Sequence, residues 1–469
     1  MTRNEFLKAY KYRGYLHFDH PFPSPHAAWS YVTKFRDGRL NPKHGFLPFV
    51  GFTLSNLKIS REKVEGVPRK QQKIVYKTKQ RNIKIASHKD SAIYTYYGKY
   101  LSALYERCLA RLSIENVATA FRSLPGGKCN IDHAKEVFDF IHHHRPCVAL
   151  AFDVEKFFDT LSHTYLRERW ADLLEMPQLP PDHYQVYRSL TRFAWVSRQA
   201  AYNEFGISEH NPKLKKPNPK RTRICSIDEF RSRIRASGLI QHNPRNSEGQ
   251  VRGIPQGSPM SAVLSNIYML KFDTAMHGFA RSIGGLYRRY CDDIMLIVPP
   301  EFEECGKIIT YSNIQQLEIK CNEDKTEIVR YLGGNNATEK ALQYLGFTYD
   351  GQAVRLRQSS LDRYYGKMRK GVRFAVKCQN KAIKKSGSYQ RLRKRKLLTK
   401  YTHFAQRQRG VNLRHRTRKY NSKNFITYGI KAAKIFESPA IKKQIRRHWG
   451  KLHKQISKKE IQPESKRAE

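Results

Sequence analysis

The chain has 469 residues, with 88 Lys and Arg against 40 Asp and Glu, which gives a formal net charge of +48 at pH 7. Hydrophobic residues make up 39% of the sequence and aromatic residues 12%, so the chain can build cores and wholesale disorder is excluded. The basic excess disfavours a neutral metabolic enzyme. It favours a polyanionic partner, with a phosphate backbone as the first candidate and an anionic membrane surface as the alternative.

The eight cysteines are scattered, with no C-x-x-C pair and no Cys/His cluster at zinc-finger spacing, so we expect reduced thiols in a cytosol. The first twenty residues contain no apolar signal region. No run of about 18 uncharged apolar residues occurs in the sequence. The sequence therefore predicts a cytoplasmic protein without a membrane partner.

Two stretches are predicted to be irregular. Residues 1–75 are aromatic and broken by proline, which favours irregular or short-helical structure over long elements. Residues 210–225, HNPKLKKPNPKRTRIC, are rich in Pro, Asn and Lys and nearly free of apolar side chains. This second stretch is predicted to be a basic surface loop, part of an insertion at about 205–250 in a larger domain.

A candidate catalytic carboxylate lies in CVALAFDVEKFFDTL, residues 147–161. An apolar run ends there on Asp153, which is typical of a buried strand that delivers one acid to its exposed end. A carboxylate in that position is suited to bind a cation.

Two further acids lie side by side in GGLYRRYCDDIMLIVPP, residues 284–300. Apolar arms flank Asp292 and Asp293, which predicts a short hairpin with carboxylates at its tip. Adjacent carboxylates raise each other's pKa unless a cation neutralises them, and Mg²⁺ prefers carboxylates, waters and substrate phosphates as ligands. A solvent-facing Asp-Asp turn is the alternative, because turns are rich in Asp.

Polar segments between and around these acids are suited to bind a nucleotide. RGIPQGSPMSAVLSNIYML, residues 252–270, combines a Gly/Pro turn that carries Gln256 with a helix opened by Ser-Pro. Lys77, Lys79 and Arg81 alternate along a predicted strand, as side chains that grip a triphosphate would. Downstream lie Lys325 and LQYLGFTYDG, residues 342–351, a predicted hairpin with an aromatic tip.

The C-terminal quarter concentrates the charge. Residues 361–469 hold 34 Lys and Arg and five acids, more than half of the net excess. Apolar and aromatic residues recur there at helical intervals, which predicts basic amphipathic helices that bind nucleic acid. The alternative is a solvated helical face.

In order and spacing, these segments resemble the palm and fingers of a reverse transcriptase over roughly residues 75–350. FDVEKFF resembles the first palm motif, PQGSP the template- and nucleotide-contacting motif, YCDD the Y-x-D-D hairpin, NEDKTE the motif that follows it and YLGF the primer grip. The flank AFRSLPGGKCNIDHA and the helical C-terminus are similar to bacterial reverse transcriptases of antiphage defence, with retron and group II intron enzymes as more distant relatives.

The resemblance implies a role for each matching residue. Asp153, Asp292 and Asp293, with the backbone carbonyl of Val154, would hold two Mg²⁺ ions for in-line nucleotidyl transfer. Phe158 would exclude a ribose 2′-hydroxyl as a steric gate, or else be an ordinary core aromatic. The remaining residues implied to contact the nucleotide are Gln256 at the base, Lys79 and Arg81 at the phosphates, and Lys325 as proton donor to pyrophosphate; plain surface charge is the alternative for Lys77, Lys79 and Lys325.

Taken together, the sequence predicts an α+β right-hand polymerase. Its predicted parts are an N-terminal extension (1–75), fingers and palm (76–355), and a basic helical thumb and RNA-binding region (356–469). The predicted activity is RNA-directed DNA synthesis on a noncoding RNA template with dNTPs as substrates and cDNA as product, in antiphage defence. The oligomeric state, including a homo-oligomer, is left open. Residues predicted to bind RNA are Arg391, Arg393, Lys394, Arg395 and Lys396.

Two other functions compete with this prediction. One is a maturase-like RNA-binding protein with a vestigial polymerase site, which the intact set of three acids disfavours. The other is an RNA-dependent RNA polymerase, which the bulky Phe158 disfavours.

Overall fold

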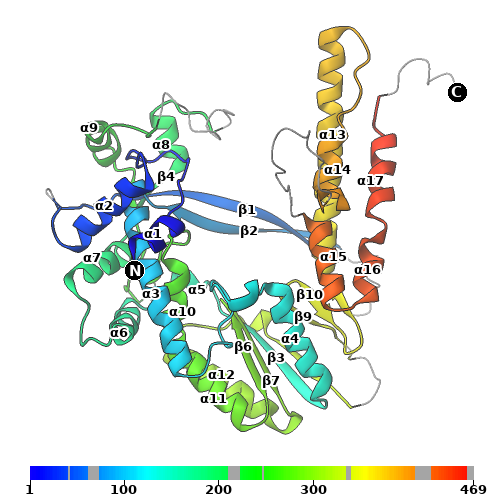
Figure 1. The fold of residues 1–469 in the computed structure, drawn as a ribbon, viewed down its shortest axis with the longest axis horizontal. Helices are drawn as coiled ribbons and strands as arrows, with labels where there is room; N and C mark the ends of the chain where they lie inside the picture. The colour runs from blue at the N-terminus through cyan, green and yellow to red at the C-terminus, as the bar shows by residue number, and fades with distance from the viewer. Residues whose placement is uncertain are drawn as a thin grey trace.

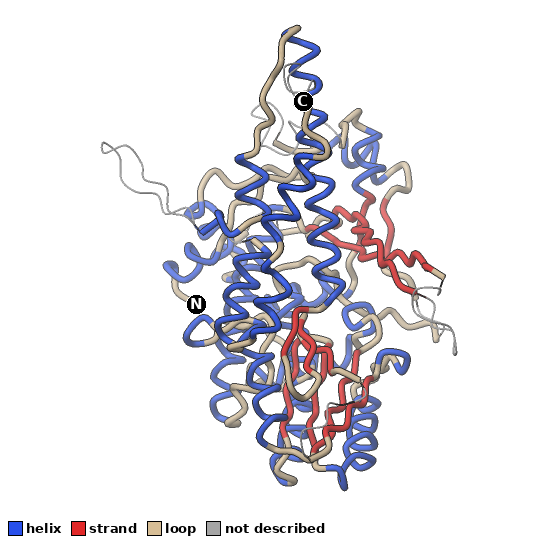
Figure 2. Tube along the Cα trace, turned by 90° about the vertical axis from the view of Figure 1, so that its right-hand side faces the viewer, coloured by secondary structure: helices blue, strands red, loops and turns tan. Residues whose placement is uncertain are grey.

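The computed structural model describes residues 1–40, 43–61, 73–209, 222–245, 248–333, 338, 340–406 and 424–461. A central sheet packed on helices occupies the lower part of Figure 1, and a long two-stranded ribbon crosses above it. A helical C-terminal region stands beside the ribbon. Figure 2, turned by 90°, separates the ribbon from the strands of the central sheet.

The central sheet is antiparallel, in the order β6-β7-β3-β8. Its strands are β3 (Cys147–Asp153), β6 (Leu286–Tyr290), β7 (Asp293–Val298) and β8 (Glu327–Tyr331). The strand predicted to end at Asp153 and the hairpin around the acid pair are both confirmed. β3 lies between two neighbours and is buried on both faces, which explains its nearly continuous apolar sequence.

Helices cover both faces of this sheet. Leu150 and Phe152 of β3 pack in one core with residues of α10 (Ser261–Tyr268), α11 (Leu270–Ser282) and α12 (Glu303–Gln316). Cys147 and Ala149, which point to the opposite face, pack in a second core with α4 (Asn130–His143) and the C-terminal region. Alternate residues of one strand therefore anchor two cores, as the two-residue period of a strand requires.

A second sheet, in the order β2-β1-β4-β5, contains the long ribbon. Its strands are β1 (Phe49–Arg61), β2 (Ile74–Ile85), β4 (Ala194–Ser197) and β5 (Ile240–His242). The remaining helices and helical turns before the C-terminal region are α1 (Arg3–Ala9), α2 (Pro25–Arg36), α3 (His88–Arg111), η1 (Pro125–Gly127), α5 (Phe157–Thr160), α6 (His163–Leu173), α7 (Pro181–Thr191), α8 (Arg198–Glu204), α9 (Ile227–Glu229), η3 (Phe230–Arg235), η4 (Pro300–Phe302) and η5 (Glu323–Lys325).

The expectation of irregular or short-helical structure throughout residues 1–75 was wrong for β1. This strand pairs along its whole length with β2, from Val50 opposite Ile85 to Arg61 opposite Ile74. The pairing therefore crosses the predicted boundary at residue 75. The pairing with β2 supplies the backbone hydrogen bonds of β1. A segment whose own residues favour a strand only weakly depends on such a partner.

The C-terminal region begins with a small sheet of β9 (Leu342–Tyr344), β10 (Phe347–Tyr349) and β11 (Val354–Leu356), which confirms the hairpin predicted at 342–351. Its helices are α13 (Gln358–Ser386), α14 (Arg395–Tyr401), the short turn η6 (His403–Gln406), α15 (Phe425–Ile435), α16 (Pro439–Arg446) and α17 (His448–Ser457). Leu361, Tyr364, Met368 and Val372 of α13 are buried at the predicted helical spacing.

The five RNA-binding residues predicted near 391–396 do not all lie on a helix. α13 ends at Gly387, whose φ of 66° is a left-handed helix cap, and α14 begins only at Arg395. Arg391, Arg393 and Lys394 therefore lie in the connecting segment. Lys394 forms an ion pair with Glu460, with 2.7 Å between Nζ and Oε2.

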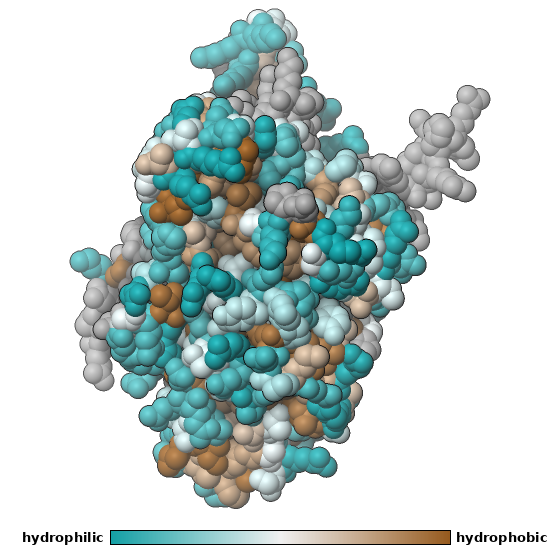
Figure 3. All heavy atoms as spheres, turned by 90° about the vertical axis from the view of Figure 1, so that its left-hand side faces the viewer, coloured by the Kyte–Doolittle hydropathy of each residue, from teal (hydrophilic) through white to brown (hydrophobic). Residues whose placement is uncertain are grey.

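The face opposite the C-terminal region is mainly hydrophilic, with hydrophobic side chains scattered over it (Figure 3).

Within the part of the chain that the structure describes, no helix is both long enough and apolar enough to cross a membrane. Most of the predicted basic loop, residues 210–221, lies outside the described residues. The mixed α+β fold class is confirmed, with an antiparallel central sheet, a long ribbon and a helical C-terminal region (Figure 1).

Candidate active site

Strand register brings the three predicted acids to one end of the central sheet. Asp153, the last residue of β3, is paired with Asp293, the first residue of β7. Asp292 lies in the two-residue turn between β6 and β7, and its carbonyl accepts a 3.2 Å hydrogen bond from the backbone N–H of Val154. The turn requires a left-handed residue at Cys291, whose φ is +60°.

The electrostatics of this cluster are those of crowded negative charge. Asp293 remains accessible to solvent, yet desolvation by the surrounding protein, with the charges of Asp292 and Asp153, raises its pKa to about 6. Lys325 and Lys79 oppose that rise. Lys325 also donates a hydrogen bond from Nζ to Oδ2 of Asp153, so one cation already partly compensates the cluster.

These residues fit a divalent cation by the chemistry of their donors. They supply carboxylate oxygens, the ligand type that Mg²⁺ prefers, at a place where the raised pKa of Asp293 reports excess negative charge. Among the described residues, no three His, Cys, Asp or Glu side chains form a ready-made metal cluster.

Phe158 lies beside the nucleotide-contacting turn predicted from the sequence. Its neighbour Phe157 is 3% exposed and belongs to the core, whereas Phe158 is only partly buried at the edge of that core. The carbonyl of Phe158 accepts a 2.8 Å hydrogen bond from the N–H of Ile254. Of the two rings, Phe158 is therefore the one with a face left for another molecule.

Close backbone contacts hold the 253–257 turn, residues Gly253 to Gly257, against its surroundings. A Cβ on Gly253 would lie 2.6 Å from the carbonyl oxygen of Asp159, so only glycine fits there. The carbonyl of Gln256 accepts a 2.8 Å hydrogen bond from the N–H of Lys84 in β2. This contact ties the ribbon to the turn.

The ribbon carries its predicted basic residues in a strand, as expected. Lys79 and Arg81 are exposed and lie opposite Asn56 and Leu54 of β1. The charge of Lys79 acts on Asp293, so the structure brings this residue toward the acids. Lys77 also lies in β2, but its side chain is outside the described part of the chain.

The hairpin of β9 and β10, which contains the predicted primer grip, is joined to α4 and, through α4, to α15 by hydrogen bonds. The carbonyl of Leu345, in the turn between β9 and β10, accepts a 3.0 Å hydrogen bond from Nδ2 of Asn130 in α4. The same amide donates to the hydroxyl of Tyr428 in α15 at 2.9 Å. One side chain thus joins three parts of the molecule.

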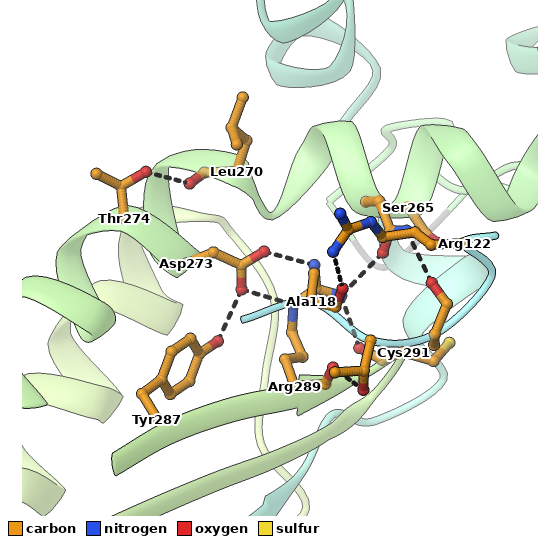
Figure 4. Close-up of polar contacts among 12 residues, drawn as sticks. Ala118, Arg122, Ser265, Leu270, Asp273, Thr274, Tyr287, Arg289 and Cys291 are labelled. Atoms are coloured by element: carbon orange, nitrogen blue, oxygen red, sulfur yellow. Dashed lines mark hydrogen bonds and ion pairs between the residues drawn. The ribbon is translucent and has the colours of Figure 1, made fainter. Parts of the chain in front are cut away.

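A buried ion pair that sequence reasoning missed supports the acid hairpin from behind (Figure 4). Arg289 and Asp273 are both fully buried, with Nε to Oδ1 at 2.7 Å and Nη2 to Oδ2 at 2.6 Å. Nη1 of Arg289 donates to the carbonyl of Cys291 at 3.0 Å, and Tyr287 donates to Asp273 at 2.7 Å. The guanidinium therefore fixes the left-handed residue that precedes Asp292.

Burial alone would lower the pKa of Arg289, but the charge and hydrogen bonds of Asp273 raise it above its ordinary value. A usable signal for this pair exists in the sequence. Residues 287, 289 and 291 share one face of the strand arm, so a charged side chain among them predicts a buried partner of opposite charge.

The comparisons with known proteins agree with this geometry. Residues 216–349 match the family described as "Reverse transcriptase (RNA-dependent DNA polymerase)". The matched segment contains Gln256, Asp292, Asp293 and Lys325, and Asp153 precedes it. No curated protein matches the chain.

Solved structures similar to this chain include an apo telomerase from Candida tropicalis (13% identity, TM-score 0.37), which aligns with 72% of this chain and 54% of its own length. A telomerase from Candida albicans in complex with a fragment of telomeric RNA has 11% identity and a TM-score of 0.40 (94% and 67%). The RNA-dependent RNA polymerase of a human picobirnavirus has 10% identity and a TM-score of 0.40 (78% and 59%). This chain thus spans 54% to 67% of these proteins.

Residues 216–349 therefore resemble a reverse transcriptase domain, a kind of domain that catalyses nucleotidyl transfer. Likeness at the TM-scores above adds nothing to that statement. What the domain does in this chain follows from the site.

Proposed function

We propose that the protein is an RNA-directed DNA polymerase that copies a noncoding RNA into cDNA by two-metal nucleotidyl transfer. The observation that carries this proposal is the pairing of Asp153 with Asp293 beside Asp292, where Asp292 and Asp293 lie inside the segment that matches the reverse transcriptase family. A protein that only binds phosphate has no reason to gather three acids at one point of a chain with a net charge of +48.

In this proposal Asp153, Asp292 and Asp293, with the carbonyl of Val154, hold two Mg²⁺ ions. The ions, when bound, supply Lewis acidity at the attacking primer 3′-hydroxyl and at the leaving pyrophosphate. The chain's own residues keep these carboxylates in place through the β3–β7 register and the Arg289 contact behind the hairpin.

The other predicted residues orient the nucleotide. Lys79 and Arg81, exposed on the ribbon, bind its phosphates, and Gln256 braces the base from the turn that Lys84 anchors. Phe158 closes the sugar side. Lys325, which forms an ion pair with Asp153, transfers this contact and then a proton to the pyrophosphate in this proposal.

The biological setting rests on the resemblance of the flanking segments to bacterial defence enzymes. We propose that the template is a noncoding RNA, that the protein acts in antiphage defence in the cytoplasm, and that the basic C-terminal helices hold the RNA. A homo-oligomer is compatible with this role.

The proposal is tested by separating RNA binding from synthesis. Replacing both Asp292 and Asp293 by Ala should abolish Mg²⁺-dependent dNTP incorporation and leave the affinity for RNA and the melting temperature within experimental error of wild type. Incorporation at wild-type level by this variant would show that these acids do not carry the chemistry, and no incorporation by a wild-type protein that binds RNA would favour a maturase-like binding protein.

Shrinking Phe158 to Ala should admit ribonucleotides. The ring is only partly buried beside the 253–257 turn, so its removal opens room at the sugar without emptying the core. We expect discrimination between dNTP and rNTP, measured as the ratio of kcat/KM values, to fall at least about tenfold, which corresponds to about 1.4 kcal/mol. The control is Phe157→Leu, a core change that should lower stability and leave that ratio alone; unchanged discrimination in Phe158→Ala would make Phe158 a packing residue.

Reversing the charge of Arg391, Arg393, Lys394, Arg395 and Lys396 to Glu should weaken RNA binding and flatten its salt dependence. Each lost phosphate contact removes about 0.7 units from the slope of log K against log salt for a single strand. Synthesis on a generic primed template should suffer less than synthesis on the native RNA, since the palm is unchanged. Lys99→Glu with Arg107→Glu, two exposed cations of α3, serves as control; a slope equal to that of the control would make the C-terminal charge a solvated face.

A further inference from the structure

A cavity of about 510 Å³ lies beside Val251, two residues before the 253–257 turn. Its walls include His163 at the start of α6, Arg192 and Phe193 after α7, and His242 at the end of β5 with Asn243 and Arg245 after it. Pairing of Ala194 with His242 brings the last two segments together. The volume falls in the range of pockets that hold nucleotide-sized ligands.

The cavity is positively charged and has no acid among its lining residues. Within the described part of the chain, neither Arg192 nor Arg245 has a carboxylate partner; Nη1 of Arg245 donates to the neutral carbonyl of Gly249 at 2.8 Å. Burial lowers the pKa of His163, and the charges of Arg252 and Arg192 lower it further against the effect of a hydrogen bond to Gly253. The positive potential in the cavity is therefore not balanced by the protein itself.

One lining residue of the cavity, His163, is hydrogen-bonded to the 253–257 turn. Nε2 of His163 donates a 2.7 Å hydrogen bond to the carbonyl of Gly253, whose own N–H donates to the carbonyl of Leu161 at 2.8 Å. The next residue, Ile254, donates to Phe158. A ligand in the cavity would thus contact His163, whose hydrogen bond to Gly253 connects the cavity to the turn that carries Gln256 and contacts Phe158.

We propose that this cavity binds a nucleotide phosphate of a single-stranded nucleic acid that passes behind the 253–257 turn. The inference deepens the proposed function, on which it rests, by giving the strand a second holding point outside the carboxylate cluster. Two guanidinium groups with free donors match a phosphate group, and the imidazoles of His163 and His242 add flat surfaces for the attached nucleoside.

The test uses the full-length protein, a fluorescein-labelled 12-nucleotide oligouridine and fluorescence anisotropy, without dNTP or Mg²⁺. Arg192→Ser with Arg245→Ser should raise the Kd about tenfold and reduce the slope of log K against log salt by about 0.7 units, for one lost phosphate contact. The matched control is Lys99→Ser with Arg107→Ser, which removes the same charge from α3 and should behave as wild type. All substitutions are at exposed positions, and equal melting temperatures verify the folds.

A Kd and slope equal to those of the control would overturn the proposal. A second arm measures the binding of free dATP to the same variants by equilibrium dialysis. If Arg192→Ser with Arg245→Ser loses affinity for dATP but binds oligouridine like the control, the cavity binds a free nucleotide, and the proposal of a bound single strand is refuted. Repeating the first arm in the Asp292→Ala, Asp293→Ala background separates the two proposals. If the wild-type protein fails to incorporate dNTP while Arg192→Ser with Arg245→Ser still weakens oligouridine binding in this background, the polymerase proposal is refuted and the cavity proposal stands.

Discussion

Replacing Asp153 by Asn is expected to reduce dNTP incorporation at least about a thousandfold, equivalent to about 4 kcal/mol of transition-state stabilisation. The amide keeps the shape of the carboxylate and removes its charge at the point where β3 meets Asp293. It also weakens the contact with Lys325. The measurement is single-turnover extension of a primed RNA template, which reports the chemical step separately from product release.

The matched control for this variant is Asp172→Asn on α6, which breaks an ion pair with Arg169 of 2.8 Å at the surface. It should keep near wild-type incorporation, since exposed ion pairs contribute little. If Asp153→Asn retained more than about a tenth of the wild-type rate, Asp153 would not be a metal ligand and the proposed mechanism would be wrong.

Replacing Arg289 by Met is expected to destabilise the fold by about 3–5 kcal/mol, because it leaves the fully buried Asp273 without its counter-charge. The carbonyl of Cys291 loses its donor at the same time. Urea unfolding followed by circular dichroism measures the effect. In any fraction that remains folded, kcat should fall more than the KM for dNTP changes, since the acid hairpin and not the nucleotide contacts is released.

A double variant distinguishes loss of the pair from loss of volume. Arg289→Met combined with Asp273→Leu removes both charges and should recover much of the stability lost by the single change. If Arg289→Met alone cost less than about 1 kcal/mol, the ion pair would not hold the hairpin.

Features encoded by local pattern were predictable from the sequence. The apolar run that ends on Asp153, the arms around Asp292 and the helix after Ser258 each carry their period within a few residues, and all three form as expected. The mutual approach of these segments depends on pairing between β3 and β7, which lie more than a hundred residues apart. Motif order supplied that information, whereas periodicity did not.

Other features depend on partners that no local pattern names. β1 forms a 13-residue strand because β2 pairs with it, although Pro and aromatic residues precede it. The segment after Ser386 leaves the helix because Gly387 takes a left-handed conformation, which placed Arg391 outside the predicted helices. The Arg289–Asp273 pair joins a strand to a helix, so each residue alone looks like an isolated charge in an apolar sequence.

The proposed activity is tested most directly by incubating the wild-type protein with a primed homopolymeric RNA, labelled dNTP and Mg²⁺, and digesting the product. We expect a labelled strand that is complementary to the template and that DNase destroys but RNase does not. This product should be absent when Mg²⁺ is chelated. Labelled product formed only from rNTP, or no product on any primed RNA by a folded protein that still binds the RNA, would contradict it.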